Sequence, residues 1–274
     1  MSNRSSLGSK LIAAPYMVWA VLFIVAPLIF VVYYSFTTAD GSFTLANMQA
    51  LGKYAPTFLR SIWFGIVATL ICLVIAFPLA YFISQKTDKV QRTLVMLVML
   101  PMWMSFLIRT YSWMALLQDT GIINSFLSKL GIDPVHMINT PGAVILGMVY
   151  NFLPYMIMPI YSVMAKLDYS MVEACQDLGG NRLTVIRRCI IPMSMPGVVS
   201  GITMVFVPSV STFYISQKLG GGSFDLIGDV IERQFQQSYN YNLGAAISLV
   251  LMVLILICMA IMNRFTEDEE GMVI

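Results

Sequence analysis

The sequence predicts an all-α membrane protein with six transmembrane helices, on the basis of its composition, its hydropathy and the length of its apolar runs. The chain has 274 residues, of which 58% are hydrophobic and 11% charged, and its mean hydropathy is +0.78. Soluble domains carry about 25% charged residues. Six apolar stretches are each long enough for a helix to cross a hydrocarbon core about 30 Å thick.

Each expected span must satisfy its own backbone hydrogen bonds in lipid, and unbroken apolar runs of this length exclude barrel strands. The first run is longer than the apolar core of a secretory signal, about 7–15 residues, so we expect it to be retained. We expect residues 1–274 to form one transmembrane domain. The expected spans are Leu11–Phe36, Phe58–Ser84, Thr93–Leu117, Pro141–Ala165, Gly197–Ser216 and Leu243–Asn263.

Charges in the connecting segments predict the orientation. With a cytoplasmic N-terminus, ten of the 16 basic residues lie inside, five lie outside, and Arg109 lies within the third span. Cytoplasmic loops carry an excess of Lys and Arg, so we expect both termini in the cytoplasm. A charge inside a span usually faces protein or water. We therefore expect Arg109 to point inward and to pair with polar groups at a helix interface.

Proline and glycine predict where the spans bend and where they pack closely. The pair Gly197-x-x-x-Gly201 would allow a neighbouring helix to approach. Prolines inside spans kink a helix because they lack the backbone N–H. The expected kinks lie at Pro78, Pro101, Pro154, Pro159 and Pro208.

A polar segment, residues 166–196, separates the fourth and fifth spans. Ser170 and Glu173 have the spacing of a capping box, which predicts the start of a short helix. Gly179-Gly180-Asn181 tolerates positive φ and predicts its end. A second helix is expected from about Arg182, with one apolar stripe and a proline stop before the fifth span. The stripe is Leu183, Ile186, Cys189 and Ile190, and the stop is Pro192 and Pro196.

The stretch from Glu173 to Gly179, with Pro192 beyond it, resembles the EAA loop of binding-protein-dependent ABC importer permeases. That consensus runs Glu-Ala-Ala, three residues, Gly, nine residues, Ile, one residue, Leu-Pro. Here Glu173, Ala174, Gly179 and Pro192 fall on the motif. The alternative is a helix pair lying on the membrane surface, with Glu173 only as a cap. Three positions depart from the motif but stay apolar: Cys175, Cys189 and Ile191.

The resemblance implies a type I ABC importer permease in the bacterial cytoplasmic (inner) membrane, whose loop 166–196 couples it to a separate ATPase. The chain has no Gly-x-x-x-x-Gly-Lys-[Ser/Thr] motif, so no cofactor is expected in it, and ATP and Mg are expected on the partner. Six helices are too few to enclose a pathway. The expected partners are a second, C-type permease, two ATPase subunits, an extracytoplasmic solute-binding protein and membrane lipid, without nucleic acid.

Three further stretches are most similar to the B-type permease of spermidine/putrescine importers: Leu100–Trp103 with Ser105–Trp113, Leu146–Tyr161, and Ala174–Gly179 with Ile191–Gly197. Permeases for iron, thiamine, sulfate or phosphonates share much of this plan and remain alternatives. A polyamine is a flexible polycation, best held by carboxylates and aromatic faces. The candidate pathway residues are Trp103, Tyr111, Trp113, Asp119, Tyr150 and Tyr155.

Each of these groups also has a structural interpretation. Aromatic residues in spans often serve as packing or interface anchors, and Asp119 would also suit the cap of a helix that begins near Gly121. The segment Asp225–Gln237 predicts an amphipathic helix with an acidic face. That face is either a solvated surface, a dock for a binding protein or an attractor of cations. Its acidic residues, at i, i+4 and i+7, are Asp225, Asp229 and Glu232.

Two other classes of protein fit the sequence less well. A secondary transporter would carry ion-coupling carboxylates or histidines near the middle of its spans, and none of the 14 acidic residues lies there. An intramembrane enzyme would need a nucleophile with its base, or a metal cluster. The one histidine, His136, is expected to be a solvated loop side chain.

Overall fold

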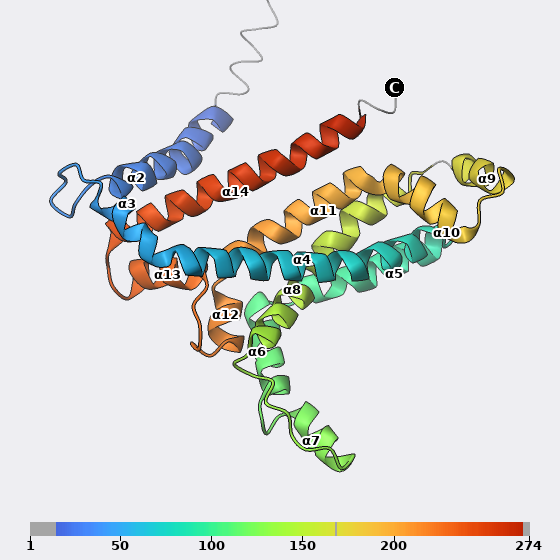
Figure 1. The fold of residues 1–274 in the computed structure, drawn as a ribbon, viewed down its shortest axis with the longest axis horizontal. Coiled ribbons are helices and arrows are strands. Elements are labelled where there is room, and N and C mark those ends of the chain that lie inside the picture. Colours follow the sequence, from blue (N-terminus) through green and yellow to red (C-terminus); the bar gives the residue numbers. More distant parts are fainter. Residues whose placement is uncertain (1–14, 168, 271–274) are drawn as a thin grey trace, which may run out of the picture. The chain divides into compact units, whose positions relative to one another are not determined.

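The structure is a computed structural model that describes residues 15–167 and 169–270, and all named elements in these ranges are helices (Figure 1). An isolated antiparallel bridge between Thr37 and Phe43 adds a small β contact. The chain forms two compact units. The smaller comprises Met1–Ala55 and Val230–Leu254, and the larger comprises Pro56–Asp229 and Ile255–Ile274.

The smaller unit is built on one long apolar helix, Pro15–Ser35, whose predicted beginning at Leu11 lies outside the described residues. Asn242 ties the chain after this helix by donating to the carbonyl oxygen of Thr37 at 2.7 Å. Asn47 donates to the same carbonyl at 3.0 Å. The elements that lie wholly or partly in this unit are η1 (Val21–Val25), α2 (Ala26–Ser35), α3 (Ala46–Ala50), η2 (Leu51–Tyr54), α13 (Ile227–Gln236) and α14 (Tyr241–Glu270).

The larger unit holds the polar segment 166–196 and the helices on either side of it. Its fourth span begins sharply, because the Thr140 hydroxyl accepts from the backbone N–H of Ala143 at 3.2 Å and Pro141 follows the cap. Its elements are α4 (Ala55–Ser84), α5 (Asp88–Met99), η3 (Leu100–Trp103), α6 (Phe106–Leu117), α7 (Ile122–Lys129), α8 (Pro141–Met164), α9 (Tyr169–Asp177), α10 (Arg182–Val185), η4 (Ile186–Ile190), α11 (Ile191–Ser211) and α12 (Tyr214–Leu219).

Helices α8 and α11 make the most extensive contact in the larger unit and run side by side in Figure 1. Two glycines on α11 make this contact possible. A Cβ on Gly197 would lie 2.8 Å from the Pro159 carbonyl oxygen, and one on Gly201 would lie 3.2 Å from that of Met156. The expected close packing at this glycine pair is therefore confirmed.

Helix α4 also packs through small residues. Four residues at a spacing of four along it are completely buried, and the Cys72 thiol lies 3.8 Å from the carbonyl oxygen of Val149 on α8. In membranes such small-residue faces let helix backbones approach closely. The buried stripe is Ala68, Cys72, Ala76 and Ala80.

The expected all-α fold is confirmed, since five helices are long and apolar enough to cross a membrane and a bent pair makes a sixth candidate span. One expected span is wrong in shape. The third, Thr93–Leu117, is two helical segments, Asp88–Trp103 and Phe106–Lys129, bent by 87°. Pro101 is the second residue of a tight 3₁₀ turn that begins at Leu100, and Met104 adopts an extended conformation (φ −81°, ψ 147°), so the α-helical hydrogen bonds end there.

The fifth span also differs from expectation, because Pro192 and Pro196 do not stop the preceding helix. Residues Arg182–Ser211 form one helix of 30 residues. A π-helical turn at η4 precedes the first proline, and the Ile191 N–H bonds to the Ile186 carbonyl, five residues back. Such a turn changes the hydrogen-bond register and lets a helix bend without breaking. The expected end at Ser216 is wrong as well, because Thr212 is extended and α12 begins at Tyr214.

We predict that Gly197→Ala lowers the stability of the chain by about 1–3 kcal/mol, because the added methyl group overlaps backbone atoms of α8 that cannot move independently. Thermal unfolding of the purified protein in detergent measures the loss as a lower Tm. Gly142→Ala is the matched control, since a Cβ there meets only the Thr140 hydroxyl at 3.8 Å. Equal Tm values for the two variants would contradict the assigned packing.

Candidate functional site

The polar segment 166–196 forms two short helices joined by a glycine turn. Helix α9 begins at Tyr169, so Ser170 is the second residue of the helix and the expected cap at Ser170 is two positions too late. Gly179 has φ +83°, which confirms the expected left-handed end of the helix. The Gly180 N–H bonds to the Cys175 carbonyl at 3.1 Å, and the Gly179 N–H to that of Gln176 at 2.8 Å. These two bonds form a Schellman motif.

The residue after this turn has a different role from the one expected. Asn181 has φ −74° instead of a positive value, and its side-chain oxygen accepts from the Thr184 N–H at 2.8 Å, so it caps the second helix. The backbone at Gly180 passes close to the last turn of α9, where a side chain would not fit. A Cβ at Gly180 would lie 2.5 Å from the Cys175 carbonyl oxygen. One turn thus ends α9 and starts α10.

Helix α9 packs against the second helix through one side only. Val172 is 5% exposed, and the Cys189 thiol lies 3.7 Å from the Met171 carbonyl oxygen. The predicted apolar stripe of the second helix is partly wrong, because Leu183 is 73% exposed. The buried side is instead formed by Val185, Cys189 and Ile190.

The motif residues Glu173, Ala174, Gly179 and Pro192 are all exposed. Two leucines of the same segment are also exposed: Leu178, to which the sequence assigned no role, is 90% exposed, and Leu183 is 73% exposed. An apolar, exposed position at the C-terminal turn of α9 is the signal that could have identified Leu178. Leu178 and Leu183 thus add exposed apolar area to the segment that carries the motif residues.

The candidate pathway residues do not form a single cluster. Trp113 packs edge-on against Tyr150, with 5.3 Å between ring centroids, while Trp103 is 74% exposed and Tyr155 is 41% exposed. Tyr111 belongs to another group, in which its ring stands perpendicular to that of Tyr214 at 6.1 Å.

Asp119 and His136 form a surface pair, with 2.9 Å between Oδ1 and Nδ1. Both side chains are about 60% exposed, at 61% and 60%. The solvated position expected for His136 is confirmed, but it has a partner. Asp119 does not cap α7, whose N-cap is Gly121 without a side-chain hydrogen bond.

Arg109 on α6 is only 8% exposed, so its expected inward position is confirmed. The expected polar pairing is wrong for two of its atoms: among the described residues, Nε and Nη1 have no hydrogen-bond partner. The guanidinium lies instead 6.0 Å from the centre of the Phe106 ring. An aromatic face stabilises a cation without supplying a hydrogen-bond acceptor.

The acidic face expected at Asp225–Gln237 is interrupted, because Asp229 is 4% exposed. Its Oδ1 accepts from the Ser216 hydroxyl and its Oδ2 from the Leu226 N–H, both at 2.8 Å. The adjacent Ile227 N–H donates to the Ser61 hydroxyl of α4 at 2.7 Å. Asp229 therefore joins the turn before α13 to α12.

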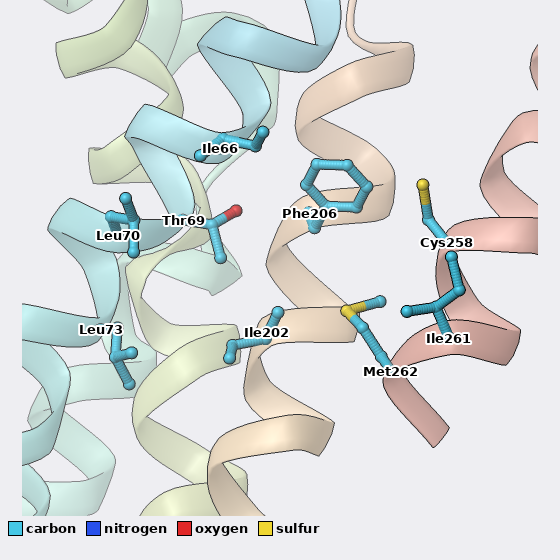
Figure 2. A pocket seen from close by; sticks show the side chains of 9 residues that line it. All are labelled: Ile66, Thr69, Leu70, Leu73, Ile202, Phe206, Cys258, Ile261 and Met262. Carbon is cyan, nitrogen blue, oxygen red and sulfur yellow. The ribbon is translucent and has the colours of Figure 1, made fainter. Parts of the chain in front are cut away.

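An apolar cavity of about 300 Å³ lies between α4, α11 and the end of α14. Figure 2 shows its side chains converging from these three helices. The one hydroxyl in the lining, on Thr69, already donates to the Gly65 carbonyl at 2.7 Å. None of the nine lining residues carries a carboxylate, so the cavity suits an apolar group rather than a polycation.

Long apolar helices interrupted by an exposed polar helix pair define the class of integral membrane permeases. The family model described as the binding-protein-dependent transport system inner membrane component matches residues 72–267, and the chain belongs to this family. It is a multi-pass inner-membrane permease of an ABC importer.

Curated relatives extend the match over nearly the whole chain. The spermidine/putrescine transport system permease protein PotB of Escherichia coli (strain K12) is 39% identical over 245 residues, covering 86% of this chain and 89% of that protein. PotB of Haemophilus influenzae is 36% identical over 265 residues, covering 93% of each. These relatives are transport permeases, as expected for this chain, and not enzymes.

Solved structures show the same fold at lower identity. A bacterial ABC transporter involved in the import of the acidic polysaccharide alginate gives a TM-score of 0.76 at 18% identity, covering 94% of each chain. The MetNI methionine ABC transporter gives 0.61 at 16% identity, covering 81% of this chain and 97% of that one. The expected ABC importer permease fold is confirmed.

We predict that Asp229→Ala lowers the free energy of unfolding by about 1–3 kcal/mol, because it leaves the Leu226 N–H buried without an acceptor. Asp229→Asn is the matched control. Its amide oxygen accepts from Leu226 while its amide N–H donates to the Ser216 hydroxyl, which also accepts. Thermal unfolding should place Asp229→Asn near the wild type, and equal losses in both variants would show that the charge matters instead.

Proposed function

We propose that this chain is the permease subunit of a polyamine importer that carries spermidine and putrescine. The observation that carries the proposal is 36–39% identity to PotB proteins across most of the chain. The 18% identity to the alginate transporter, by contrast, supports only the fold.

The aromatic side chains of the larger unit are consistent with a cationic solute. Trp113 with Tyr150, and Tyr111 with Tyr214, provide ring faces and edges on α6, α8 and α12. Ring faces attract ammonium groups and also cover methylene chains. We assign the substrate pathway to these groups, with Trp103, Asp119 and Tyr155 as more peripheral candidates.

The exposed surface of loop 166–196 is proposed to dock on the ATPase subunit. Glu173, Ala174, Gly179 and Pro192 lie on this surface, and Leu178 adds exposed apolar area. ATP and Mg would be held by that partner. The importer would also contain a second, C-type permease, a second ATPase copy and a solute-binding protein. The alginate transporter was solved in complex with a periplasmic protein.

In the proposed orientation, loop 166–196 and both termini face the cytoplasm, and α7 faces the outside. The basic residues support it. Three arginines of the loop, Arg182, Arg187 and Arg188, are exposed, and exposed basic residues are typical of cytoplasmic loops. Two of the ten basic residues assigned to the cytoplasmic side, Arg4 and Lys10, lie outside the described residues.

Gly179→Val tests the coupling assignment. A β-branched residue is strained at φ +83°, by about 1–3 kcal/mol, so the turn that positions α9 should distort. We predict at least about a fivefold fall in solute-stimulated ATP hydrolysis by the assembled complex, with normal insertion into the membrane.

Gly131→Val is the matched control, because Gly131 has φ +75° and, like Gly179, has no atom within 4 Å of a Cβ. The same backbone strain is then introduced after α7 instead of in the loop. Normal stimulation in Gly179→Val, or an equal fall in the control, would contradict coupling through this turn.

The substrate class is tested by competition. Uptake of labelled spermidine by the complex in liposomes should be blocked by excess spermidine or putrescine and unaffected by sulfate, ferric iron, thiamine or phosphonate. Sulfate and phosphonate are anions, which a desolvated site for cations should reject. Ferric iron and thiamine lack a methylene chain with an ammonium group at each end, which is the feature that aromatic faces would hold. If one of these other solutes is imported and polyamines do not compete, the importer fold stands and the polyamine assignment is wrong.

A further inference from the structure

An ammonium group of the chain itself occupies the aromatic group around Tyr111. Lys218 Nζ lies 5.5 Å from the ring centroid of Tyr111 and 5.7 Å from that of Tyr214. The two rings are nearly perpendicular, at 87°, and Phe106 adds a third ring 6.0 Å from Tyr214. These residues come from two helices, α6 and α12, both in the larger unit.

The geometry is that of a cation–π site. An ammonium within about 6 Å of an aromatic centroid is attracted by the ring quadrupole. Here one ammonium satisfies this condition for two rings at once. Tyr111 is 44% exposed, and both Tyr214 and Lys218 are half-buried, so a ligand from solution can reach the rings.

The Lys218 side chain has the same chemistry as the end of the proposed substrate. It is a chain of four methylenes that ends in a primary ammonium. Putrescine is four methylenes with an ammonium at each end, and spermidine carries the same aminobutyl arm. The Lys218 side chain thus matches putrescine with one of its two ammonium groups replaced by the link to the backbone.

We propose that Tyr111 and Tyr214 bind the aminobutyl end of the imported polyamine, and that Lys218 fills this site as a tethered competitor until the substrate displaces it. The inference rests on the proposed function and identifies a subsite within it. Two ammonium groups placed against the same pair of rings would repel one another. The site therefore holds either Lys218 or the substrate.

A tethered competitor also selects for polycations. A monoamine that displaces Lys218 exchanges one ammonium for another and gains nothing from the exchange. A polyamine keeps further ammonium groups that bind elsewhere in the pathway, and those contacts drive the exchange. Lys218 therefore excludes simple monoamines, at the cost of a higher KM for the true substrate.

The test is uptake of labelled putrescine by the complete complex in liposomes. Lys218→Met keeps an unbranched side chain that is one atom shorter but removes its charge, and should lower KM about two- to fivefold, the range for one exposed cation–π contact. n-Butylammonium should inhibit this variant more strongly than the wild type, by a similar factor. Lys218→Arg, which keeps the charge, should behave as the wild type.

A role of Lys218 in helix stability alone would change Tm and leave KM unchanged. Tyr214→Leu should raise KM in the Lys218→Met background, whereas Tyr214→Phe, which keeps a ring, should not. An unchanged or higher KM in Lys218→Met, with putrescine imported by the wild type, would overturn the subsite and leave the proposed function standing. Failure of the wild type to import any polyamine would overturn both.

A second measurement uses the chain without a substitution, in case Lys218→Met does not assemble. Reductive methylation with ¹³C-formaldehyde, followed by removal of the reagent before any amine is added, labels the Lys218 side chain and keeps its positive charge. The methyl resonance of Lys218 should lose the ring-current shift of Tyr111 and Tyr214 when saturating putrescine is added. Sodium at equal ionic strength is the control. An equal resonance position with putrescine and with sodium would contradict displacement.

Discussion

The close contact between α8 and α11 at Gly197 and Gly201 is the interaction on which the larger unit depends. Without side chains at these positions, the α11 backbone reaches within van der Waals distance of the Pro159 and Met156 carbonyls. The two helices are consecutive spans joined only by loop 166–196. Fixing them side by side therefore fixes both ends of that loop, and the loop can keep its outer face free for another protein.

Helical continuity links this loop to the fifth span. Residues Arg182–Ser211 form one helix, about 45 Å long at 1.5 Å per residue. The π-turn at η4 accommodates Pro192 without a break. In the proposed function, a displacement of α9 by the ATPase moves the base of this helix directly. The Schellman turn at Gly179 joins α9 to α10. The role of this motif glycine is therefore to adopt the positive φ that the turn requires.

Composition and motif spacing predicted the fold class, the approximate positions of the spans and the helix end at Gly179, because these depend on local chemistry. A kink was expected at Pro101, but neither the sharp break of the third span nor the passage of the helix through Pro192 was predicted. Both depend on which backbone hydrogen bonds are lost: a 3₁₀ turn followed by the extended residue Met104 ends one helix, and a π-turn preserves the other. The position of Lys218 over Tyr111 joins residues 107 positions apart and had no signal in the pattern of either segment.

The central claim is that the second helix of the loop and the fifth span move as one rigid body across the π-turn. Spin labels at Leu183 and Ser200, both exposed, measure it by double electron–electron resonance in the assembled importer. Their separation should be about 25 Å and should stay the same in the nucleotide-free and ATP-trapped states. A second distance that appears only when ATP is bound would mean that the helix hinges at the π-turn and that the rigid connection is wrong.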